Sequence, residues 1–551
     1  MQASASVSLR RSIALRRIAR LPVTVTLFLL LVTSIPTVLG YLTVPEDRWF
    51  SGVVYNVHDT AQYYSWMREY GRSMLIENRL TPEISTPVYF NLHWWIPGRS
   101  AALLGLSLVQ IYQISRLLYI PLAIAATYLF CTHLFDDTRR AHYAFLLTTF
   151  TSGMGWIWVV KKYLTSSYTL EHPQDVYTLG GNSFWVMVAA PHLVLALAAT
   201  FFTLLLALKG LRAKGWGLTL ASGLAALFLA MGHIYDLVTV WGVLGMFGLL
   251  LTLRDGWSWR VAGRLATVVL MSLPAVLYWG WVVSDANPIW KQALAQYDNL
   301  GVFTPNPLHL LILLGIPFVL SLATYNGIVP LQRQSDEQLF IKGWLIITPL
   351  LAYLPLRFQI TLLNGYQLPI AVMATWGLYN RVLPWLRHRL PDRKRIANWL
   401  PALLLLAVLP TNLYLLSWRI IDLQRNNYPY YIHQEDLAAM RWLELNAHRE
   451  DIVLSSFEIG HYIPGFTGIR PYLSNAVMTM DSHRRRGEVM AFYSSETSEA
   501  ERQDLLRHNN IRYVFYGPAE RALGGFPVEE WPILRPVYIG NETRLYEVNL
   551  P

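Results

Sequence analysis

The chain has 551 residues, of which 54% are hydrophobic and only 15% are charged. This balance does not fit a soluble globular protein and predicts an integral membrane protein, because so much apolar surface needs contact with lipid. The formal net charge is +10, but the basic residues cluster in short loops between apolar runs. The charge therefore indicates membrane topology rather than a nucleic-acid partner. A single cysteine, Cys131, excludes an intrachain disulfide or thiolate metal site.

The first apolar run, residues 21–44, follows a group of N-terminal arginines. These are Arg10, Arg11, Arg16, Arg17 and Arg20. The run is long enough to cross about 30 Å of hydrocarbon, whereas the core of a signal peptide has roughly 7 to 15 residues. We therefore expect an uncleaved first membrane span with the N-terminus in the cytoplasm.

Later apolar runs predict the remaining spans, which gives roughly eleven helices in all. They lie near residues 111–135, 141–160, 191–208, 216–231, 237–253, 261–283, 308–323, 343–356, 366–379 and 399–418. Lysine and arginine gather in alternate loops, at 139–140, 209–214, 254–264 and 387–395. Such loops are cytoplasmic by the positive-inside rule, and an odd number of spans then places the C-terminus outside.

Three segments on the predicted outer side are too long for simple turns: 45–110, 161–190 and 419–551. Long outer loops usually carry function. In the first of them, apolar residues at helical spacing predict an amphipathic helix that lies along the membrane interface. They are Tyr63, Met67, Tyr70, Met74 and Leu75, and Trp94 and Trp95 follow where an aromatic belt is expected.

The last segment, 419–551, has no further span and predicts a small soluble domain beside a membrane module of residues 1–418. Helices are expected at 435–447 and 503–508, and strands at 451–455 and 512–516. Three consecutive arginines, 484–486, predict a solvated basic face, with docking of an anionic acceptor as the alternative. The expected fold is a polytopic α-helical membrane protein with a C-terminal extracytoplasmic α/β domain.

Several motifs in chain order resemble the GT-C class of polytopic glycosyltransferases, in particular bacterial members. They are Asp59 with Gln62-Tyr63-Tyr64, Thr81-Pro82-Glu83, Ser152-Gly153-Met154-Gly155-Trp156, Ala190-Pro191-His192-Leu193, Gly232-His233-Ile234-Tyr235-Asp236, and the segments 436–443, 460–468 and 512–518. The resemblance implies inverting transfer of a sugar from a polyprenyl-phosphate-linked donor to an acceptor outside the cytoplasmic membrane. It identifies neither the sugar nor whether the acceptor is a protein, a glycan or a lipid.

For Asp59, the resemblance implies a catalytic base, or a residue that binds the acceptor or a metal. The chemistry agrees with this role, because a carboxylate within hydrogen-bond reach accepts the proton of an acceptor hydroxyl. Partial burial near lipid would raise its basicity. The alternative is that Asp59 only caps the predicted interfacial helix.

The resemblance also implies a second acidic residue in the second long loop. We predict Asp175 for this role and Glu171 as the second choice, although an ordinary solvated carboxylate is an equal alternative. Several histidines lie in or beside the same two loops: His58, His93, His172 and His192. A divalent cation such as Mg or Mn held by Asp59 and one of these groups is conceivable, and metal dependence is left open.

The phosphate leaving group needs stabilisation at the outer membrane boundary, for which arginine is best suited. We predict Arg357, at the outer end of the ninth span, and then Arg99, with snorkelling to the interface as the alternative. The remaining residues predicted to bind substrate are His58, His192, His233, Tyr235 and Asp236. The last three alternatively just form a short outer turn.

Two other classes of protein are compatible with many spans and outer loops: a lipid or solute transporter or flippase, and a non-catalytic membrane scaffold. Transporters usually have charged residues within their spans and repeated halves. This sequence has little mid-span charge, Arg116 being the main example, and no internal repeat. Its acidic residues gather in the outer loops, which favours an enzyme.

Overall fold

The computed structural model describes residues 2–166, 173–296, 303–323, 330–356, 358–389 and 394–550. Its internal contacts divide the chain into two compact units. Unit 1 comprises Met1–Ile35, Ser115–Val276 and Val302–Trp418, and unit 2 comprises Pro36–Ile114, Leu277–Gly301 and Arg419–Pro551. Both units are discontinuous in sequence. The last boundary, after Trp418, lies where the sequence predicts the soluble domain to begin.

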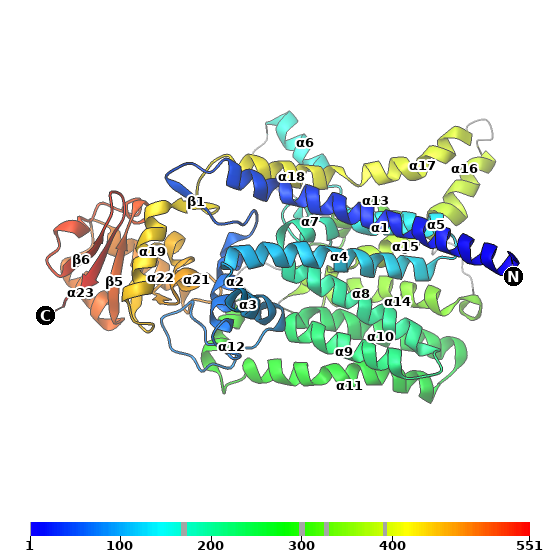
Figure 1. Ribbon diagram of the computed structural model, residues 1–551, viewed down its shortest axis with the longest axis horizontal. Helices are drawn as coiled ribbons and strands as arrows, with labels where there is room; N and C mark the ends of the chain where they lie inside the picture. Colours follow the sequence, from blue (N-terminus) through cyan, green and yellow to red (C-terminus); the bar gives the residue numbers. More distant parts are fainter. Residues whose placement is uncertain are drawn as a thin grey trace. The chain divides into compact units, whose positions relative to one another are not determined.

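The described residues of unit 1 form helices joined by short turns and loops, without strands. In whole or in greater part it contains α1 (Gln2–Leu42), α4 (Leu108–Leu134), α5 (Thr138–Phe150), α6 (Trp156–Thr165), α7 (Ser183–Ala189), α8 (Pro191–Leu211), α9 (Gly217–Gly232), α10 (Ile234–Asp255), α11 (Trp259–Val282), α13 (His309–Leu322), α14 (Asp336–Ala352), α15 (Gln367–Gly377), α16 (Leu383–Arg389), α17 (Lys394–Ala407) and α18 (Pro410–Leu423). Short 3₁₀ turns η1 (Gln174–Val176), η4 (Leu331–Arg333) and η5 (Gln359–Leu363) and a π-helical turn η6 (Leu378–Val382) join them. The helices α8, α9 and α10 pack side by side (Figure 1).

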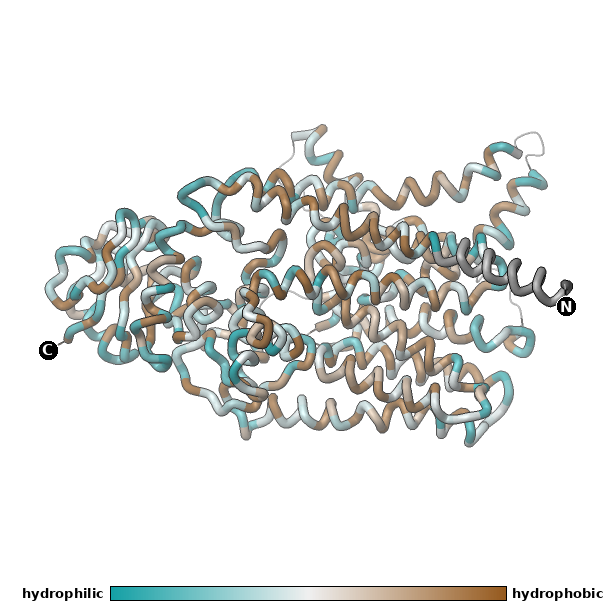
Figure 2. The backbone as a smooth tube through the Cα atoms, viewed as in Figure 1, coloured by the Kyte–Doolittle hydropathy of each residue, from teal (hydrophilic) through white to brown (hydrophobic). Residues whose placement is uncertain are grey.

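Six helices of the described chain are long and apolar enough to cross a membrane, judged by length and composition. They are Arg20–Leu42, Leu108–Leu134, Pro191–Leu211, Ile234–Asp255, Trp259–Val282 and Arg395–Leu423, of which the last joins α17 and α18. Figure 2 shows these segments as mostly hydrophobic. Shorter apolar helices, α9 and α13, accompany them. The prediction of a polytopic helical protein is confirmed, and the number of eleven spans stays a prediction.

The predicted span 141–160 is wrong as a single helix. The helix α5 ends at Phe150, and the segment 151–155 leaves helical structure before α6 begins at Trp156. Gly153 and Gly155 in this segment pack closely against the side chain of Asp175. On the other side, Gly315 of α13 lies against Ser152 and Gly153 and has a left-handed φ of 70°. A Cβ on Gly315 would lie 2.7 Å from the Ser152 carbonyl oxygen. Local packing thus overrides the hydrophobic pattern.

The charged residue predicted within a span, Arg116, is buried in unit 1 and 3% exposed. Its guanidinium donates hydrogen bonds to the hydroxyls of Thr33 (2.7 Å) and Ser34 (3.0 Å) on α1. These hydroxyls accept hydrogen bonds from the guanidinium N–H groups, which hydrocarbon could not do. Arg116 therefore joins two helices, which agrees with its interpretation as an exception rather than part of a transport pathway.

Unit 2 combines the first long loop with the C-terminal residues. It contains β1 (Arg48–Phe50), α2 (Val57–Tyr70), α3 (Leu92–Leu104), α12 (Pro288–Ala295), β2 (Tyr431–His433), α19 (Gln434–Asn446), β3 (Ile452–Leu454), α20 (Phe457–Gly460), α21 (Ile463–Thr467), β4 (Arg470–Pro471), α22 (Ser482–Tyr493), α23 (Glu499–His508), β5 (Ile511–Tyr516), α24 (Pro518–Arg521), η8 (Val528–Glu530), β6 (Leu534–Ile539) and β7 (Arg544–Val548). The predicted C-terminal helices and strands are all present. The antiparallel pair of β1 with β2 links the first long loop to the start of the C-terminal segment.

The C-terminal sheet of unit 2 has five strands in the order β4-β3-β5-β7-β6 (Figure 1, orange to red). The strand β3 is parallel to β4 and β5, while β7 is antiparallel to β5 and β6. Its strands and helices share one apolar core that includes Leu454, Val489, Phe492, Val514 and Trp531. This sheet and its helices confirm the predicted α/β domain.

The helix α2 is buried within unit 2, which differs from the predicted interfacial helix. Met67 and Tyr70 are both 0% exposed, and α2 packs against α3 and α21. Trp94, predicted for an aromatic belt, is also buried and stacks on Tyr63 with ring centroids 4.2 Å apart. The predicted apolar residues Met67 and Tyr70 face protein, because residues about 400 positions later complete the surroundings of α2. The helix ends at Tyr70, so Met74 and Leu75 lie beyond it and are exposed, which corrects their predicted place on its apolar side.

A buried arginine of the C-terminal segment holds the first long loop. Arg470 is 0% exposed and donates to the backbone carbonyls of Asn78 (2.9 Å), Thr81 (3.2 Å) and Glu83 (3.0 Å). It also forms ion pairs with Glu77 (2.6 Å) and with a second glutamate, Glu450. The motif Thr81-Pro82-Glu83 therefore has a structural role in unit 2. Removing such a buried charge would leave its partners uncompensated.

Candidate functional site

Asp59 is the third residue of α2, three positions after Asn56. Asn56 occupies the N-cap with a left-handed φ of 50°. Its side-chain amide donates a hydrogen bond of 2.5 Å to Asp59 Oδ2. Asp59 itself is therefore not the capping residue, although it lies in the first turn where the helix dipole favours a negative charge. The carboxylate is half-buried, and burial raises the pKa of Asp59 from its usual range.

The neighbouring His58 contacts aromatic and polar groups of the C-terminal segment. Its Nδ1 lies 2.9 Å from Nε2 of His461 and 3.1 Å from the hydroxyl of Tyr428. The ring of Phe457 lies 5.8 Å from the His58 ring, centroid to centroid. Burial lowers the pKa of both imidazoles, and that of His461 lies well below the usual histidine range.

A guanidinium, that of Arg486, lies near the same ring system. Its Cζ is 4.8 Å from the centroid of Phe457, and its charge contributes, after burial, to the lowered pKa of His58. The adjacent Arg485 is buried instead: it is 4% exposed, lies over the Tyr472 ring and pairs with Glu83. The prediction of a wholly solvated basic face at 484–486 is therefore wrong for Arg485.

Asp175 lies in unit 1, in the turn η1, and is 1% exposed. The backbone N–H of Gly155 donates to Asp175 Oδ2 at 2.8 Å, and the Thr411 hydroxyl lies 3.4 Å from the same oxygen. A Cβ on either Gly153 or Gly155 would overlap the carboxylate. The glycines of the motif at 152–156 are thus explained by close packing around Asp175. Burial raises the pKa of Asp175 to about 6.

A second group in unit 1 brings together four residues that the sequence predicts to bind substrate. His233 Nδ1 lies 3.2 Å from Asp236 Oδ2, and the His233 ring lies 6.1 Å from that of His192 and 5.4 Å from that of Tyr235. Asp236 is 1% exposed and accepts a hydrogen bond of 2.9 Å from the Asn364 amide. These residues do not simply form a local turn, because the side chain of Asp236 is held by Asn364, which lies 128 positions later in the sequence.

The other predicted site residues are not brought to Asp59. Arg99 donates a hydrogen bond of 2.8 Å to the Gly71 carbonyl, just past the end of α2. Twelve residues of helix separate this point from Asp59, which corresponds to about 18 Å. Arg357 and Glu171 lie outside the described residues. Asp59 and His58 belong to unit 2, whereas Asp175 and the His233 group belong to unit 1.

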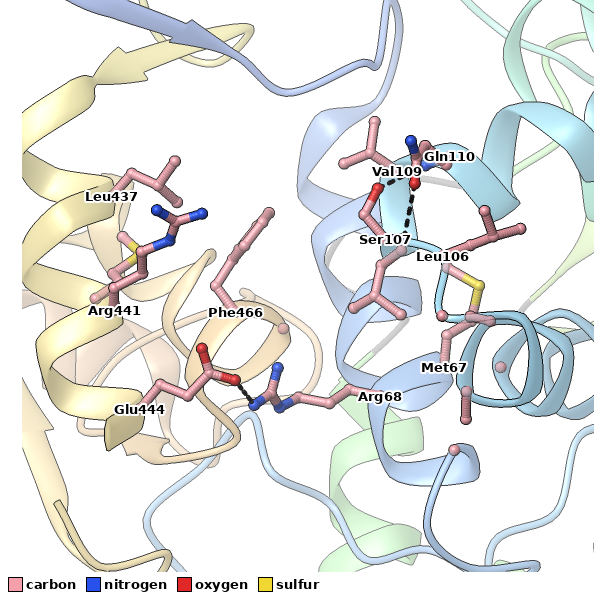
Figure 3. A pocket seen from close by; sticks show the side chains of 18 of the residues that line it. Met67, Arg68, Leu106, Ser107, Val109, Gln110, Leu437, Arg441, Glu444 and Phe466 are labelled. Carbon is pink, nitrogen blue, oxygen red and sulfur yellow. Dashed lines mark hydrogen bonds and ion pairs between the residues drawn. The ribbon is translucent and has the colours of Figure 1, made fainter. Parts of the chain in front are cut away.

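Unit 2 also contains a cavity of about 730 Å³. Side chains of α19 line one side, those of α2 and of the turn between α3 and α4 line the other, and Phe466 lies between them (Figure 3). The lining is mainly apolar, with Arg72 and Arg441 at its edge and an ion pair between Arg68 and Glu444. A cavity of this size suits a ligand.

In the described part of the chain, no three or more His, Cys, Asp and Glu side chains are grouped so as to hold a metal ion. His58 Nδ1 already faces His461 and Tyr428, and the Asp59 carboxylate accepts from an amide. The described side chains around Asp59 therefore contact one another and do not form a ready metal site.

The sequence did not single out His461 or Tyr428 of the His58 group, and it named Arg486 only within the run 484–486, as a solvated face or a docking surface for an anionic acceptor. His461 lies in the segment 460–468 that carries the family resemblance, which attached no role to it. Tyr428 had no signal in the sequence, because only the fold brings it to a residue 370 positions earlier.

No protein-family model matches the chain, and no curated protein matches it by sequence. Solved structures match it by fold. The archaeal oligosaccharyltransferase AglB from Archaeoglobus fulgidus, in complex with an inhibitory peptide and a dolichol-phosphate, matches with a TM-score of 0.52 and 12% identity, over 89% of this chain and 69% of that one. ArnT from Cupriavidus metallidurans, bound to undecaprenyl phosphate, matches with a TM-score of 0.50 and 14% identity, over 95% and 98%.

Both likenesses extend over most of this chain and concern the fold. They agree with the motifs at 152–156, 190–193 and 232–236, which point to the same class independently. The chain therefore has the fold of the GT-C class of polytopic membrane glycosyltransferases.

Proposed function

We propose that this protein is a membrane glycosyltransferase that transfers a sugar from a polyprenyl-phosphate-linked donor to an extracytoplasmic acceptor. The observation that carries the proposal is the position of Asp59. Its half-buried carboxylate lies in the first turn of a buried helix, in the loop that follows the first span, where it accepts a hydrogen bond from one amide and is next to His58 in sequence. The GT-C fold supports the proposal, as do the dolichol-phosphate and undecaprenyl phosphate bound by the two similar structures.

The reaction assigned to Asp59 is general-base catalysis. An acceptor hydroxyl oxygen forms a bond to the anomeric carbon of the donor sugar, and the bond from that carbon to the phosphate oxygen breaks. The bonding electron pair leaves with the lipid phosphate, and the hydroxyl proton moves to Asp59. Attack opposite to the leaving phosphate inverts the anomeric carbon. The raised pKa of Asp59 favours this step, because a more basic carboxylate accepts a proton more readily.

The other predicted residues take supporting roles in this proposal. Asp175, the second acidic residue, positions the turn at 152–156, because its carboxylate accepts a hydrogen bond from the backbone N–H of Gly155. The group of His192, His233, Tyr235 and Asp236 binds substrate, and Arg357 stabilises the leaving phosphate. Arg99 is the weaker candidate for that role, because its guanidinium already holds the end of α2.

The topology proposed with this function follows the distribution of lysine and arginine. The N-terminus is cytoplasmic, and the first long loop and the C-terminal domain are outside. In this orientation the donor enters from the outer leaflet of the cell membrane and the acceptor approaches from the extracytoplasmic side. The cavity in unit 2 offers space for part of the acceptor, because both the first loop and the C-terminal domain line it.

A panel of polyprenyl-phosphate sugars tests the proposal on the purified full-length protein in lipid nanodiscs. For the true donor, we expect an increase in Tm, since a ligand at 100 times its Kd stabilises a protein by about 2.7 kcal/mol. We also expect slow release of polyprenyl phosphate and free sugar, because water takes the place of the acceptor hydroxyl. The Asp59→Asn variant should retain the Tm increase and lose turnover. Absence of both signals across the panel would contradict the proposal and favour a transporter or a scaffold.

A further inference from the structure

His58 and His461 form a pair of imidazoles in unit 2 whose nitrogens face each other directly. His58 Nδ1 and His461 Nε2 are 2.9 Å apart, and the two ring centroids are 4.3 Å apart. His461 is 1% exposed, at the end of the short helix α20. The two residues are 403 positions apart in sequence. A contact at this distance requires that one nitrogen carries a proton and the other a lone pair.

The hydrogen bonds around His461 determine which nitrogen carries the proton. His461 Nδ1 lies 2.5 Å from the backbone carbonyl oxygen of Phe457. A carbonyl oxygen only accepts hydrogen bonds, so the Nδ1 of His461 is protonated. Burial keeps this imidazole neutral, because it lowers the pKa of His461 well below the usual range. His461 Nε2 therefore has the lone pair, and His58 Nδ1 donates to it.

This assignment fixes the other nitrogen of His58. A neutral imidazole with its proton on Nδ1 has a lone pair on Nε2. Burial lowers the pKa of His58 and so favours its neutral form. Its ring contacts Tyr428 and His461, and Asp59 is the next residue on the same helix. The Tyr428 oxygen, 3.1 Å from Nδ1, acts as a second acceptor. The positive charge of Arg486 opposes a second proton on the ring.

We propose that His461 is a positioning residue for the transfer reaction, which holds His58 with its proton on Nδ1 so that Nε2 accepts a hydrogen bond from the incoming acceptor beside Asp59. The inference rests on the proposed function and names the chemistry of its acceptor side. His58 and Asp59 then both accept hydrogen bonds, which suits a substrate that presents several hydroxyl groups. Without His461, the proton of His58 is free to move to Nε2, which would turn the acceptor into a donor.

Two substitutions of His461 separate positioning from a general effect on folding. His461→Gln keeps an oxygen that can accept from His58 Nδ1, whereas His461→Leu removes the acceptor. We expect His461→Leu to lower kcat/KM by about 10- to 100-fold, the range known for groups that orient metal-binding histidines, and His461→Gln to restore most of the activity. His448→Leu, at an exposed histidine of the same unit, is the matched control.

The pH profile gives a second readout of activity. A lone pair on His461 makes His58 Nε2 more basic, because it stabilises the proton on Nδ1. The acidic limb of kcat/KM against pH should therefore move to lower pH in His461→Leu and stay in place in His461→Gln. Equal profiles and equal rates for the two variants, at equal Tm, would overturn the proposal.

The tautomer itself can be observed without any substrate. ¹⁵N NMR of histidine-labelled protein distinguishes a protonated from an unprotonated ring nitrogen, and His58→Gln assigns the His58 signals by their loss. We expect the wild type to show a neutral His58 with its proton on Nδ1. A proton on Nε2 would overturn the inference. A correct tautomer without transfer from any donor in the panel would instead contradict the proposed function alone.

Discussion

Asp59 in unit 2 and Asp175 in unit 1 are both carboxylates with a raised pKa, but their surroundings differ. Asp175 is 1% exposed and sits against two glycines that leave no room for a Cβ. Asp59 is half-buried, and its carboxylate accepts a hydrogen bond from the side-chain amide of Asn56. A carboxylate enclosed by backbone is suited to fix a turn, whereas one held by a single side chain can exchange that contact for a substrate. A raised pKa alone therefore does not distinguish a structural carboxylate from a catalytic one.

The largest effect that sharpens this comparison is expected for Asp59→Asn. The amide keeps the size of the side chain and removes its capacity to accept a proton. Loss of a general base lowers kcat by roughly 100- to 10,000-fold, and the Tm should change little, because no buried ion pair is broken. Turnover of the confirmed donor and thermal unfolding in the same nanodiscs measure both. Wild-type turnover by this variant would remove Asp59 from the chemistry.

The next effect tests the enclosure of Asp175 through its glycines. In Gly153→Ala the new methyl group would overlap the Asp175 carboxylate and lie 2.5 Å from the Ile312 carbonyl oxygen. Overpacking of this kind typically costs roughly 1 to 3 kcal/mol in the free energy of unfolding, and occasionally more. Gly245→Ala, on α10 with open space around it, is the matched control and should be neutral or slightly stabilising. Equal Tm values for the two variants would show that the turn yields easily.

The smallest effect concerns the pH dependence of stability that Asp175 contributes. Its pKa in the folded state, about 6, lies above the ordinary value of 3.8, so folding disfavours the charged form. The contribution to stability is complete below pH 4 and is lost as the pH rises through 6. The shift corresponds to roughly 1 to 3 kcal/mol.

The variant Asp175→Asn removes this titration while it keeps the shape of the side chain. The difference in unfolding free energy between wild type and variant should therefore change between pH 4 and pH 7, in favour of the wild type at the lower pH. Chemical unfolding at a series of pH values measures it. If the difference in unfolding free energy were constant over this pH range, Asp175 would be in contact with solvent in the folded protein and not enclosed.

Hydropathy and short motifs predicted much of the fold and part of the site. Long apolar runs predicted the helices α1, α4, α8, α10 and α11, because a helix that contacts lipid needs an uninterrupted apolar length. Alternating patterns predicted β3 and β5 of the C-terminal domain. Asp59 and Asp175 were chosen from their positions in the predicted outer loops and stay predictions, while His233, Tyr235 and Asp236 do lie together.

The remaining features depend on residues that only the fold brings close. The apolar side of α2 pointed to lipid, since the sequence could not show that α21 covers it. The run at 141–160 was predicted as one span, because hydropathy does not show that Gly153 and Gly155 pack against Asp175 in the folded protein. His461 carried a family motif but no role, because its partner lies at the other end of the chain. Long-range pairs of polar residues leave no periodic trace.

The clamp of Arg470 on the first long loop also has a consequence for biosynthesis. During synthesis, the carbonyl of Asn78 has no contact with Arg470 until 392 further residues have been added. At a translation rate of 5 to 20 residues per second, this takes roughly 20 to 80 s. During this time the nascent chain carries Asp59 on a helix without its final partners. A ribosome that stops before the C-terminal segment thus yields a membrane-inserted chain in which the proposed catalytic loop is unfinished.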